Sequence, residues 1–229
     1  MHLSRLLLNP VARSAARDLG DAQSMHRTVM SAFPDGAGPS AREKLCVLWR
    51  VDRDGRGGRI ALLVQSRVPP DWSGLPAGHL AESDWGEANP VTTSLEGFLG
   101  SLRAGAMHQF RLRANATRKV TKLAPDGKPT KNGARVPVRG DDGRIAWLAR
   151  LAAKNGFAIV EAEDGPELRV VEEPQAYAGR SGPRATFAAV RYEGRLRVTD
   201  VDLFRERLAV GIGPAKAFGF GLLSIARAP

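Results

Sequence analysis

The stretch GIGPAKAFGFGLLSIARAP, residues 211–229, decides between two classes of fold because it places four glycines around a single lysine near the end of the chain. Glycine-rich loops that carry a lysine usually hold the phosphates of a nucleotide. A Walker loop leads into a helix, however, and a dinucleotide fingerprint leads into a βαβ unit. Only eight residues follow Gly221, so we expect neither nucleotide-binding fold, and the preceding segments must indicate the fold class.

The first half of the chain predicts the order strand, helix, strand, strand. The expected strands cover residues 3–8, 44–51 and 59–68, and the expected helix covers residues 21–33. The glycine-containing turn DRDGRGG predicts that the last two strands form a hairpin. A proline-spaced stretch follows, which is typical of a linker or an irregular helix, and a domain boundary is expected between residues 90 and 105.

The second half shows a similar order. Apolar and polar residues alternate over residues 109–114, which indicates a half-buried strand. The next segment is rich in turn formers and predicts an extended loop or hairpin, and RIAWLARLAAKN, ending before Gly156, predicts a helix. Two α+β halves of similar size fit this order better than one doubly wound sheet. The remaining expected elements are strands at 158–163, 168–171, 186–192, 194–198 and 222–226 and a helix at 200–209.

Composition narrows the possible functions. Lys and Arg number 34 against 24 Asp and Glu, a net charge of +10 with a sequence pI near 10.6, which favours polyanionic partners such as nucleic acid. No apolar run approaches the ~20 residues of a membrane span, and no signal peptide is recognisable, so we expect a cytoplasmic protein that does not bind membranes. No histidine or cysteine cluster has metal-ligand spacing, so neither a metal site nor a cofactor is expected.

The positive charge is concentrated in one part of the chain. Residues 101–150 contain twelve Lys or Arg and three Asp. A solvated surface loop is the alternative interpretation, but the position of these cations along a strand and a glycine-interrupted segment suits contact with a phosphate backbone. Aromatic residues are sparse there, which favours a duplex or hairpin over single-stranded RNA. Nine cations form this basic segment: Arg111, Arg113, Arg118, Lys119, Lys122, Lys128, Lys131, Arg135 and Arg139.

The helix predicted over residues 21–33 carries the candidate catalytic histidine. Asp21 is placed as its N-cap, and Met25, Val29 and Phe33 recur at the spacing of a buried stripe. His26 lies beside that stripe, at the edge of the core, and Arg27 follows it. An ordinary, partly exposed histidine is the competing interpretation of this position.

Five motifs in succession resemble one family. NPVARSAARDL…SMHRTVMSAF, LLVQS…PDW, FRLRANAT, WLARLAAKNGF and GIGPAKAFGFGLLSIA together are similar to the CasE family of the RAMP superfamily, the endoribonucleases that process CRISPR precursor RNA in type I-E systems. The resemblance spans essentially the whole chain. It implies two tandem ferredoxin-like (RRM-like) α+β domains, which we place at residues 1–95 and 105–229. The implied partners are a CRISPR repeat hairpin and the other subunits of the type I-E interference complex.

The resemblance also implies a chemistry and its residues. Family members cleave RNA without metal, by attack of a 2′-hydroxyl that leaves a 2′,3′-cyclic phosphate. His26 matches the catalytic histidine, and Arg27 is the adjacent residue that would supply charge. The glycine-rich loop would contact RNA phosphates through residues that we number Gly211, Gly213, Lys216, Gly219 and Gly221.

Alternative interpretations stay open at this point. A non-catalytic RNA-binding subunit, or a basic ribosome- or DNA-associated protein, would share the charge, and the glycines would also suit a tightly packed turn. This chain has Gln23 and Ser31 where relatives often have a tyrosine and a lysine. More of the catalysis is therefore expected to depend on His26, Arg27 and a cation from elsewhere, such as Lys216.

Overall fold

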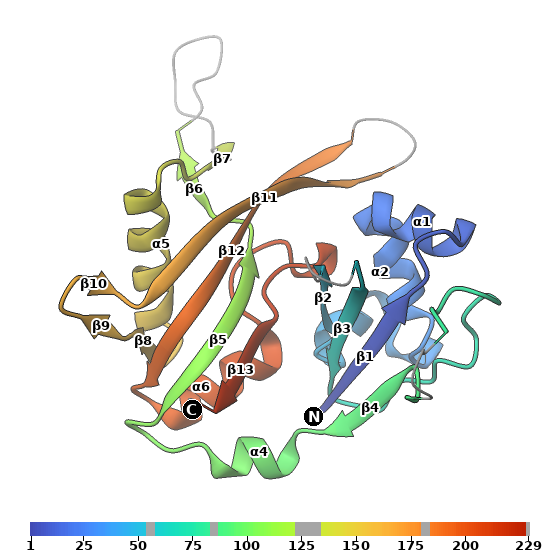
Figure 1. The fold of residues 1–229 in the computed structure, drawn as a ribbon, viewed down its shortest axis with the longest axis horizontal. Helices are drawn as coiled ribbons and strands as arrows, with labels where there is room; N and C mark the ends of the chain where they lie inside the picture. Colours follow the sequence, from blue (N-terminus) through green and yellow to red (C-terminus); the bar gives the residue numbers. More distant parts are fainter. Residues whose placement is uncertain (54–57, 83–86, 122–133, 180–183, 228–229) are drawn as a thin grey trace.

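The computed structural model describes residues 1–53, 58–82, 87–121, 134–179 and 184–227. Two antiparallel sheets lie side by side, each with helices packed on one face (Figure 1). Every strand of the first sheet comes from residues 2–94, and every strand of the second comes from residues 107–227.

The first sheet has the strand order β2-β3-β1-β4. Its strands are β1 (His2–Leu8), β2 (Leu48–Arg53), β3 (Ile60–Ser66) and β4 (Val91–Ser94). Between β1 and β2 lie α1 (Arg13–Gly20), α2 (Ala22–Met30), the 3₁₀ helix η1 (Asp35–Ser40) and α3 (Ala41–Lys44). This order, with the first strand between the third and the fourth, is that of a ferredoxin-like domain.

The second sheet has the order β11-β12-β5-β13, which is the same topology built from a later part of the chain. Its strands are β5 (Met107–Ala114), β11 (Leu168–Ala178), β12 (Ala185–Val198) and β13 (Leu223–Arg227), and β8 (Phe157–Ile159) also pairs with β12. The helices are α5 (Asp141–Ala153) and α6 (Val201–Val210), and α4 (Glu96–Ser101) connects the two sheets. The tandem ferredoxin-like fold predicted from the resemblance is confirmed.

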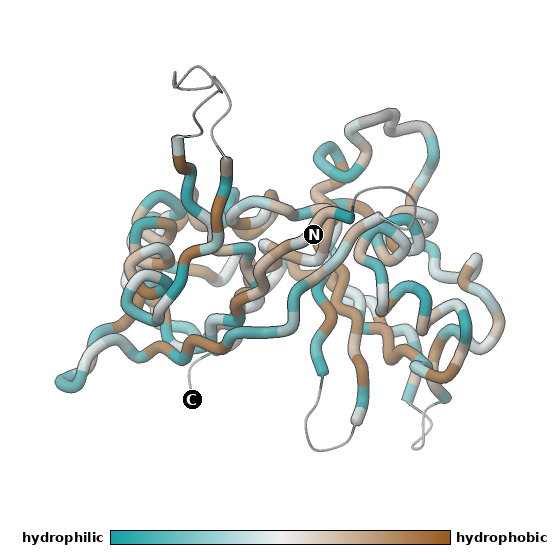
Figure 2. The backbone as a smooth tube through the Cα atoms, turned by 90° about the horizontal axis from the view of Figure 1, so that it is seen from above, coloured by the Kyte–Doolittle hydropathy of each residue, from teal (hydrophilic) through white to brown (hydrophobic). Residues whose placement is uncertain are grey.

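Smaller elements project from the second half. Two short hairpins are formed by β6 (Thr117–Val120) with β7 (Ala134–Pro137), and by β9 (Glu161–Ala162) with β10 (Gly165–Pro166). The glycine-rich loop contains the 3₁₀ helix η2 (Lys216–Phe218). Along the backbone, hydrophobic residues recur in the inner strands, and the projecting hairpins mix hydrophilic with hydrophobic positions (Figure 2).

Each sheet has its own core. In the first, Leu6 and Val64 pack with Met25 and Val29 of α2, all at most 1% exposed. In the second, Leu112 of β5 is fully buried among aromatic side chains, including Tyr192, whose ring stacks on Trp147 of α5 at 6.1 Å between centroids. Both cores follow from the hydrophobic periodicity of the sequence. Apolar residues alternate with polar ones along β5 and recur every three to four residues along α2.

Three sequence-based boundaries are wrong. The strand expected from residue 44 begins at Leu48, because Lys44 ends α3 and Cys46 takes a positive φ of 50°. Residues 91–94, expected in a linker, form the edge strand β4. The strands expected on either side of Gly194 are one strand, β12, in which a Cβ at Gly194 would lie 2.1 Å from the carbonyl oxygen of Glu167.

Candidate active site

The start of α2 is fixed by one carboxylate that contacts both halves of the protein. Asp21 caps the helix, as predicted, by accepting hydrogen bonds from the backbone N–H of Gln23 and of Ser24 at 3.4 and 3.1 Å. Its other contact comes from the backbone N–H of Gly179, just beyond β11, at 3.0 Å. Burial alone would raise the pKa of Asp21, but these bonds and one from the Ser24 hydroxyl hold it below its usual value.

His26 lies at the edge of the first core, where the helical spacing predicts it. Met25 and Val29 are buried beside it, while the His26 side chain is half-buried and its Nδ1 has no hydrogen-bond partner among the described residues. Burial lowers the pKa of His26 below its ordinary value, and the positive charge of Arg42 lowers it further. The lowered pKa favours the neutral form of the imidazole, which is the form that can accept a proton.

The glycine-rich loop of the second half reaches this helix. Its η2 segment packs against both α2 and β2, so the loop that carries Lys216 lies beside the helix that carries His26, although 190 positions separate the two residues in the sequence. Burial lowers the pKa of Lys216, and the charges of Arg42 and Arg207 add to this, while Glu43 acts in the opposite direction. Arg42 is thus an electrostatic neighbour of both His26 and Lys216.

Three of the four glycines in this loop are required by packing. A Cβ at Gly211 would lie 2.6 Å from Leu48, one at Gly219 would lie 2.6 Å from the ring of Trp49, and one at Gly221 would lie 2.7 Å from the Ile212 carbonyl. The Gly221 N–H already donates to the Arg113 carbonyl at 2.9 Å. Gly213 is different, because the nearest atom to its Cβ would be 3.7 Å away. Contact of these glycines with RNA stays a prediction beside this structural role.

The basic segment divides into three groups. Arg118, Lys119, Arg135 and Arg139 are exposed on or beside the β6–β7 hairpin, which projects from the second half (Figure 1). Arg135 Nε donates to the Thr117 hydroxyl at 3.0 Å. Arg111 and Arg113 point into the space between the two sheets. Lys122, Lys128 and Lys131 lie outside the described residues.

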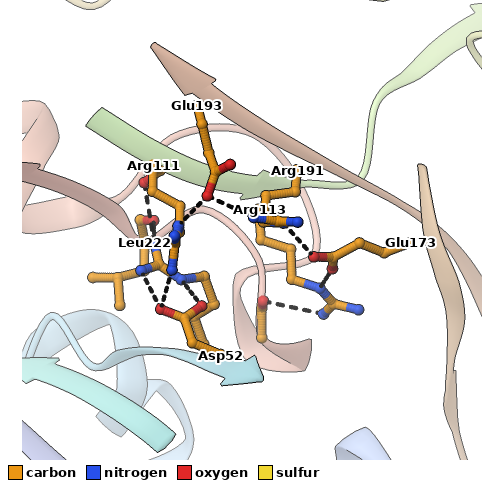
Figure 3. Close-up of polar contacts among 9 residues, drawn as sticks. Asp52, Arg111, Arg113, Glu173, Arg191, Glu193 and Leu222 are labelled. Carbon is orange, nitrogen blue, oxygen red and sulfur yellow. Dashed lines mark hydrogen bonds and ion pairs between the residues drawn. The ribbon is translucent and has the colours of Figure 1, made fainter. Parts of the chain in front are cut away.

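Arg111 joins the two sheets through a chain of ion pairs (Figure 3). From β5 it contacts Asp52 of β2 at 3.2 Å and Glu193 of β12, and Arg191 links Glu193 to Glu173. Arg113 pairs with Glu173 at 2.7 Å. The carboxylates that compensate these cations come from distant positions, which is why the sequence pattern alone presented Arg111 and Arg113 as available to RNA.

A buried arginine supports the same junction. Arg50 is 2% exposed, forms a two-pronged ion pair with Asp52 and donates to the backbone carbonyls of Arg111 and Leu222, each at 3.1 Å. Burial alone would raise the pKa of Asp52, but the bonds from Arg50 and the charges of Arg50 and Arg111 hold it below the usual range. The relative placement of the two sheets, and with it that of His26 and the glycine-rich loop, therefore rests on paired charges.

Arg27 lies on the exposed side of α2, outside the ion pairs described above. It is exposed, and its guanidinium donates to the Ser24 hydroxyl at 3.2 Å, one turn earlier on α2. Gln23 and Ser31, where the resemblance implies a tyrosine and a lysine, are exposed, and the Ser31 hydroxyl donates to the Thr28 carbonyl. Within the described ranges, no three His, Cys, Asp or Glu side chains gather as metal ligands, and no helix there is long and apolar enough to cross a membrane.

Known proteins are similar to this chain over almost its whole length. A family model described as CRISPR associated protein matches residues 1–227. The CRISPR-associated endoribonuclease Cse3 of Thermus thermophilus is 34% identical over 232 residues, covering 99% of this chain and 100% of the relative. The CRISPR system Cascade subunit CasE of Escherichia coli is 29% identical over 228 residues and covers 99% of both chains. The chain belongs to the CasE family.

A solved structure extends the likeness to three dimensions. The CRISPR endoribonuclease Cse3 bound to a 19-nucleotide RNA matches this CasE-family protein with a TM-score of 0.79 and 32% identity, covering 99% of this chain and all of the other. The likeness covers both ferredoxin-like halves, so the junction of α2 with the glycine-rich loop lies within the matched fold.

Proposed function

We propose that this protein is a metal-independent endoribonuclease that cuts the repeat hairpins of CRISPR precursor RNA and remains with its product as a subunit of a type I-E interference complex. The observation that carries the proposal is the junction of α2 with the glycine-rich loop, where the positive charge of Arg42 acts on both half-buried His26 and Lys216. The names of its relatives, an endoribonuclease and a Cascade subunit, support the same function.

The reaction needs a proton acceptor and positive charge. His26, with its lowered pKa, takes the proton of the 2′-hydroxyl next to the scissile phosphate, and the 2′-oxygen attacks phosphorus. The bond from phosphorus to the 5′-oxygen breaks, which leaves a 2′,3′-cyclic phosphate on one product and, once the 5′-oxygen gains a proton, a 5′-hydroxyl on the other. Arg27 and Lys216 supply charge that stabilises the negative phosphoryl oxygens in the transition state.

Recognition of the hairpin falls to the exposed cations of the second half. Arg118 and Lys119 on β6, with Arg135 on β7, present their charges on a narrow projecting hairpin. Such an element suits contact with the phosphates of an RNA duplex, which proteins recognise mainly by shape and backbone. Lys122, Lys128 and Lys131 lie outside the described residues and stay candidates from the sequence.

The test is cleavage of a synthetic repeat hairpin in excess EDTA, with the product ends identified by mass. We expect undiminished cleavage that yields one 2′,3′-cyclic phosphate end and one 5′-hydroxyl end, because the substrate supplies the nucleophile. Loss of activity that Mg²⁺ restores, on RNA whose fold is intact, would exclude the metal-independent mechanism. Tight binding without any cleavage would favour the alternative, a non-catalytic RNA-binding subunit.

A further inference from the structure

Two adjoining hollows lie on the surface formed by α1 and α2, outside the basic segment. The first, of about 450 Å³, is lined by Arg17, Arg27 and three hydroxyl side chains, those of Ser24, Thr28 and Ser31. The second, of about 320 Å³, is lined by Arg17 and Arg184 together with Ala16, Gly20 and Asp21. Arg17 lines both, so the two hollows form a continuous row of three arginines.

Each arginine in this row is held in place by one neighbour. Arg17 Nε contacts the Asp18 carboxylate at 2.9 Å, Arg27 donates to Ser24 at 3.2 Å, and the guanidinium of Arg184 lies 5.0 Å from the centre of the Tyr177 ring. A guanidinium has five N–H donors in a planar fork, so one anchoring contact leaves donors for a second, two-pronged partner. The row is therefore preorganised for oxyanions such as phosphate.

The nearby carboxylates are directed into the protein. Asp18 is 2% exposed and also accepts a hydrogen bond from Thr28, and Asp21 is 4% exposed and is occupied by the cap of α2 and by Gly179. Positive charge thus prevails at the surface of both hollows. The row begins at Arg27, next to His26 in the chain, crosses α1 at Arg17 and ends at Arg184, just before β12.

We propose that Arg17, Arg27 and Arg184 bind successive phosphates of the RNA strand that flanks the cleaved bond. This inference rests on the proposed function, because it takes RNA as the polyanion and His26 as the catalytic centre. It adds two residues, Arg17 and Arg184, that lie outside the basic segment. It also gives Arg27 a role in phosphate binding in addition to its proposed role in catalysis. The flanking strand would then be held on the first half while the hairpin is held on the second.

The experiment measures binding of a non-cleavable repeat RNA, with a 2′-deoxy sugar at the cleavage site, as a function of salt. Arg184→Ala removes the cation that lies over the aromatic ring of Tyr177, and Arg17→Gln removes the cation that lines both hollows. The matched control is Arg13→Ala, because Arg13 is exposed on α1 but lines neither hollow. The RNA-binding constant K decreases as salt increases, and each row variant should make the slope of log K against log[salt] less steep by ~0.7–0.9. Between ~50 and ~200 mM salt, the variant should therefore lose about threefold less affinity than the wild type does.

The control should keep the wild-type slope, and Arg17→Lys should restore most of the slope lost in Arg17→Gln, because it keeps the charge. Thermal unfolding of every variant checks that the fold is intact, and Arg184→Ala tests the row even if Arg17→Gln unfolds. Wild-type slopes in both Arg184→Ala and a folded Arg17→Gln would overturn the proposal. If the wild type binds this RNA but does not cut the corresponding ribose substrate, the proposed function is wrong. The salt slopes would still show whether the row of arginines binds RNA phosphates.

Discussion

Replacing Gly219 by alanine tests whether the glycine-rich loop is built to pack on the first sheet. Gly219 has φ +83°, where a side chain costs about 1–2 kcal/mol, and its Cβ would lie 2.6–3.0 Å from three ring atoms of Trp49. Trp49 is 3% exposed within the first core, so the overlap adds about 1–3 kcal/mol of overpacking. The expected loss is about 2–5 kcal/mol of unfolding free energy, a fall in melting temperature on the order of 10 °C for a chain of this size.

Gly213 provides the matched control within the same loop. It has φ +84°, yet its added Cβ would have no atom closer than 3.7 Å, so Gly213→Ala isolates the backbone cost of about 1–2 kcal/mol. Urea titrations of both variants should differ by about 1–3 kcal/mol, and the difference should shrink in a Trp49→Leu background, because the ring is the obstacle. Equal destabilisation by both substitutions would refute the packing argument and leave RNA contact as the reason for Gly219.

Three further outcomes follow from the charges at the junction and on the hairpin. At substrate concentrations below saturation, the cleavage rate should decrease toward acid pH as His26 is protonated, with a pKa below 6.5. Arg42→Ala should raise this pKa, because a cation that repels the protonated imidazole is gone. An unchanged pH profile in Arg42→Ala would mean that Arg42 is too far from His26 to act on it. Arg111→Ala should cost about 1–2 kcal/mol in urea, since it removes two partly exposed ion pairs, and should leave the salt slope of RNA binding unchanged. Arg118→Ala, measured in the same assays, should make the salt slope of RNA binding less steep by ~0.7–0.9 and leave the stability unchanged. If Arg111→Ala changed the salt slope and Arg118→Ala changed the stability, Arg111 would be the RNA contact and Arg118 the structural residue.

Local patterns predicted the elements and the position of the histidine well. The cap at Asp21 and the stripe of Met25 and Val29 are set by neighbours three and four residues apart, so the sequence placed His26 at the edge of the core. The helix α5 ends at Ala153, two residues before the predicted end at Asn155, and Gly156 follows at φ +77°. By contrast, β4 has four exposed residues and no apolar alternation, so only its pairing with β1 identifies it as a strand.

The electrostatics of the site depend on contacts that no local pattern encodes. Arg42 acts on His26 because α3 and α2 belong to the same half, but it acts on Lys216 because the two halves dock, and Arg111 meets Asp52 for the same reason. The row of arginines combines two helices of the first half with the residue just before β12, and in the sequence Arg184 is only one cation among 34 Lys and Arg. A count of charges along the chain therefore located the basic hairpin but could not tell paired cations from available ones.

The single-turnover cleavage rate of His26→Ala on one synthetic repeat hairpin tests the central claim most directly. If His26 transfers a proton in the transition state, the rate should fall by roughly 10²- to 10⁴-fold while RNA affinity barely changes, since phosphate contacts are spread over many Arg and Lys. Replacing the sugar upstream of the cleaved bond by its 2′-deoxy form should abolish cleavage by the wild type and leave binding intact. A wild-type rate from His26→Ala, or cleavage of the deoxy substrate, would contradict the assignment of His26 and the 2′-hydroxyl as the reacting pair.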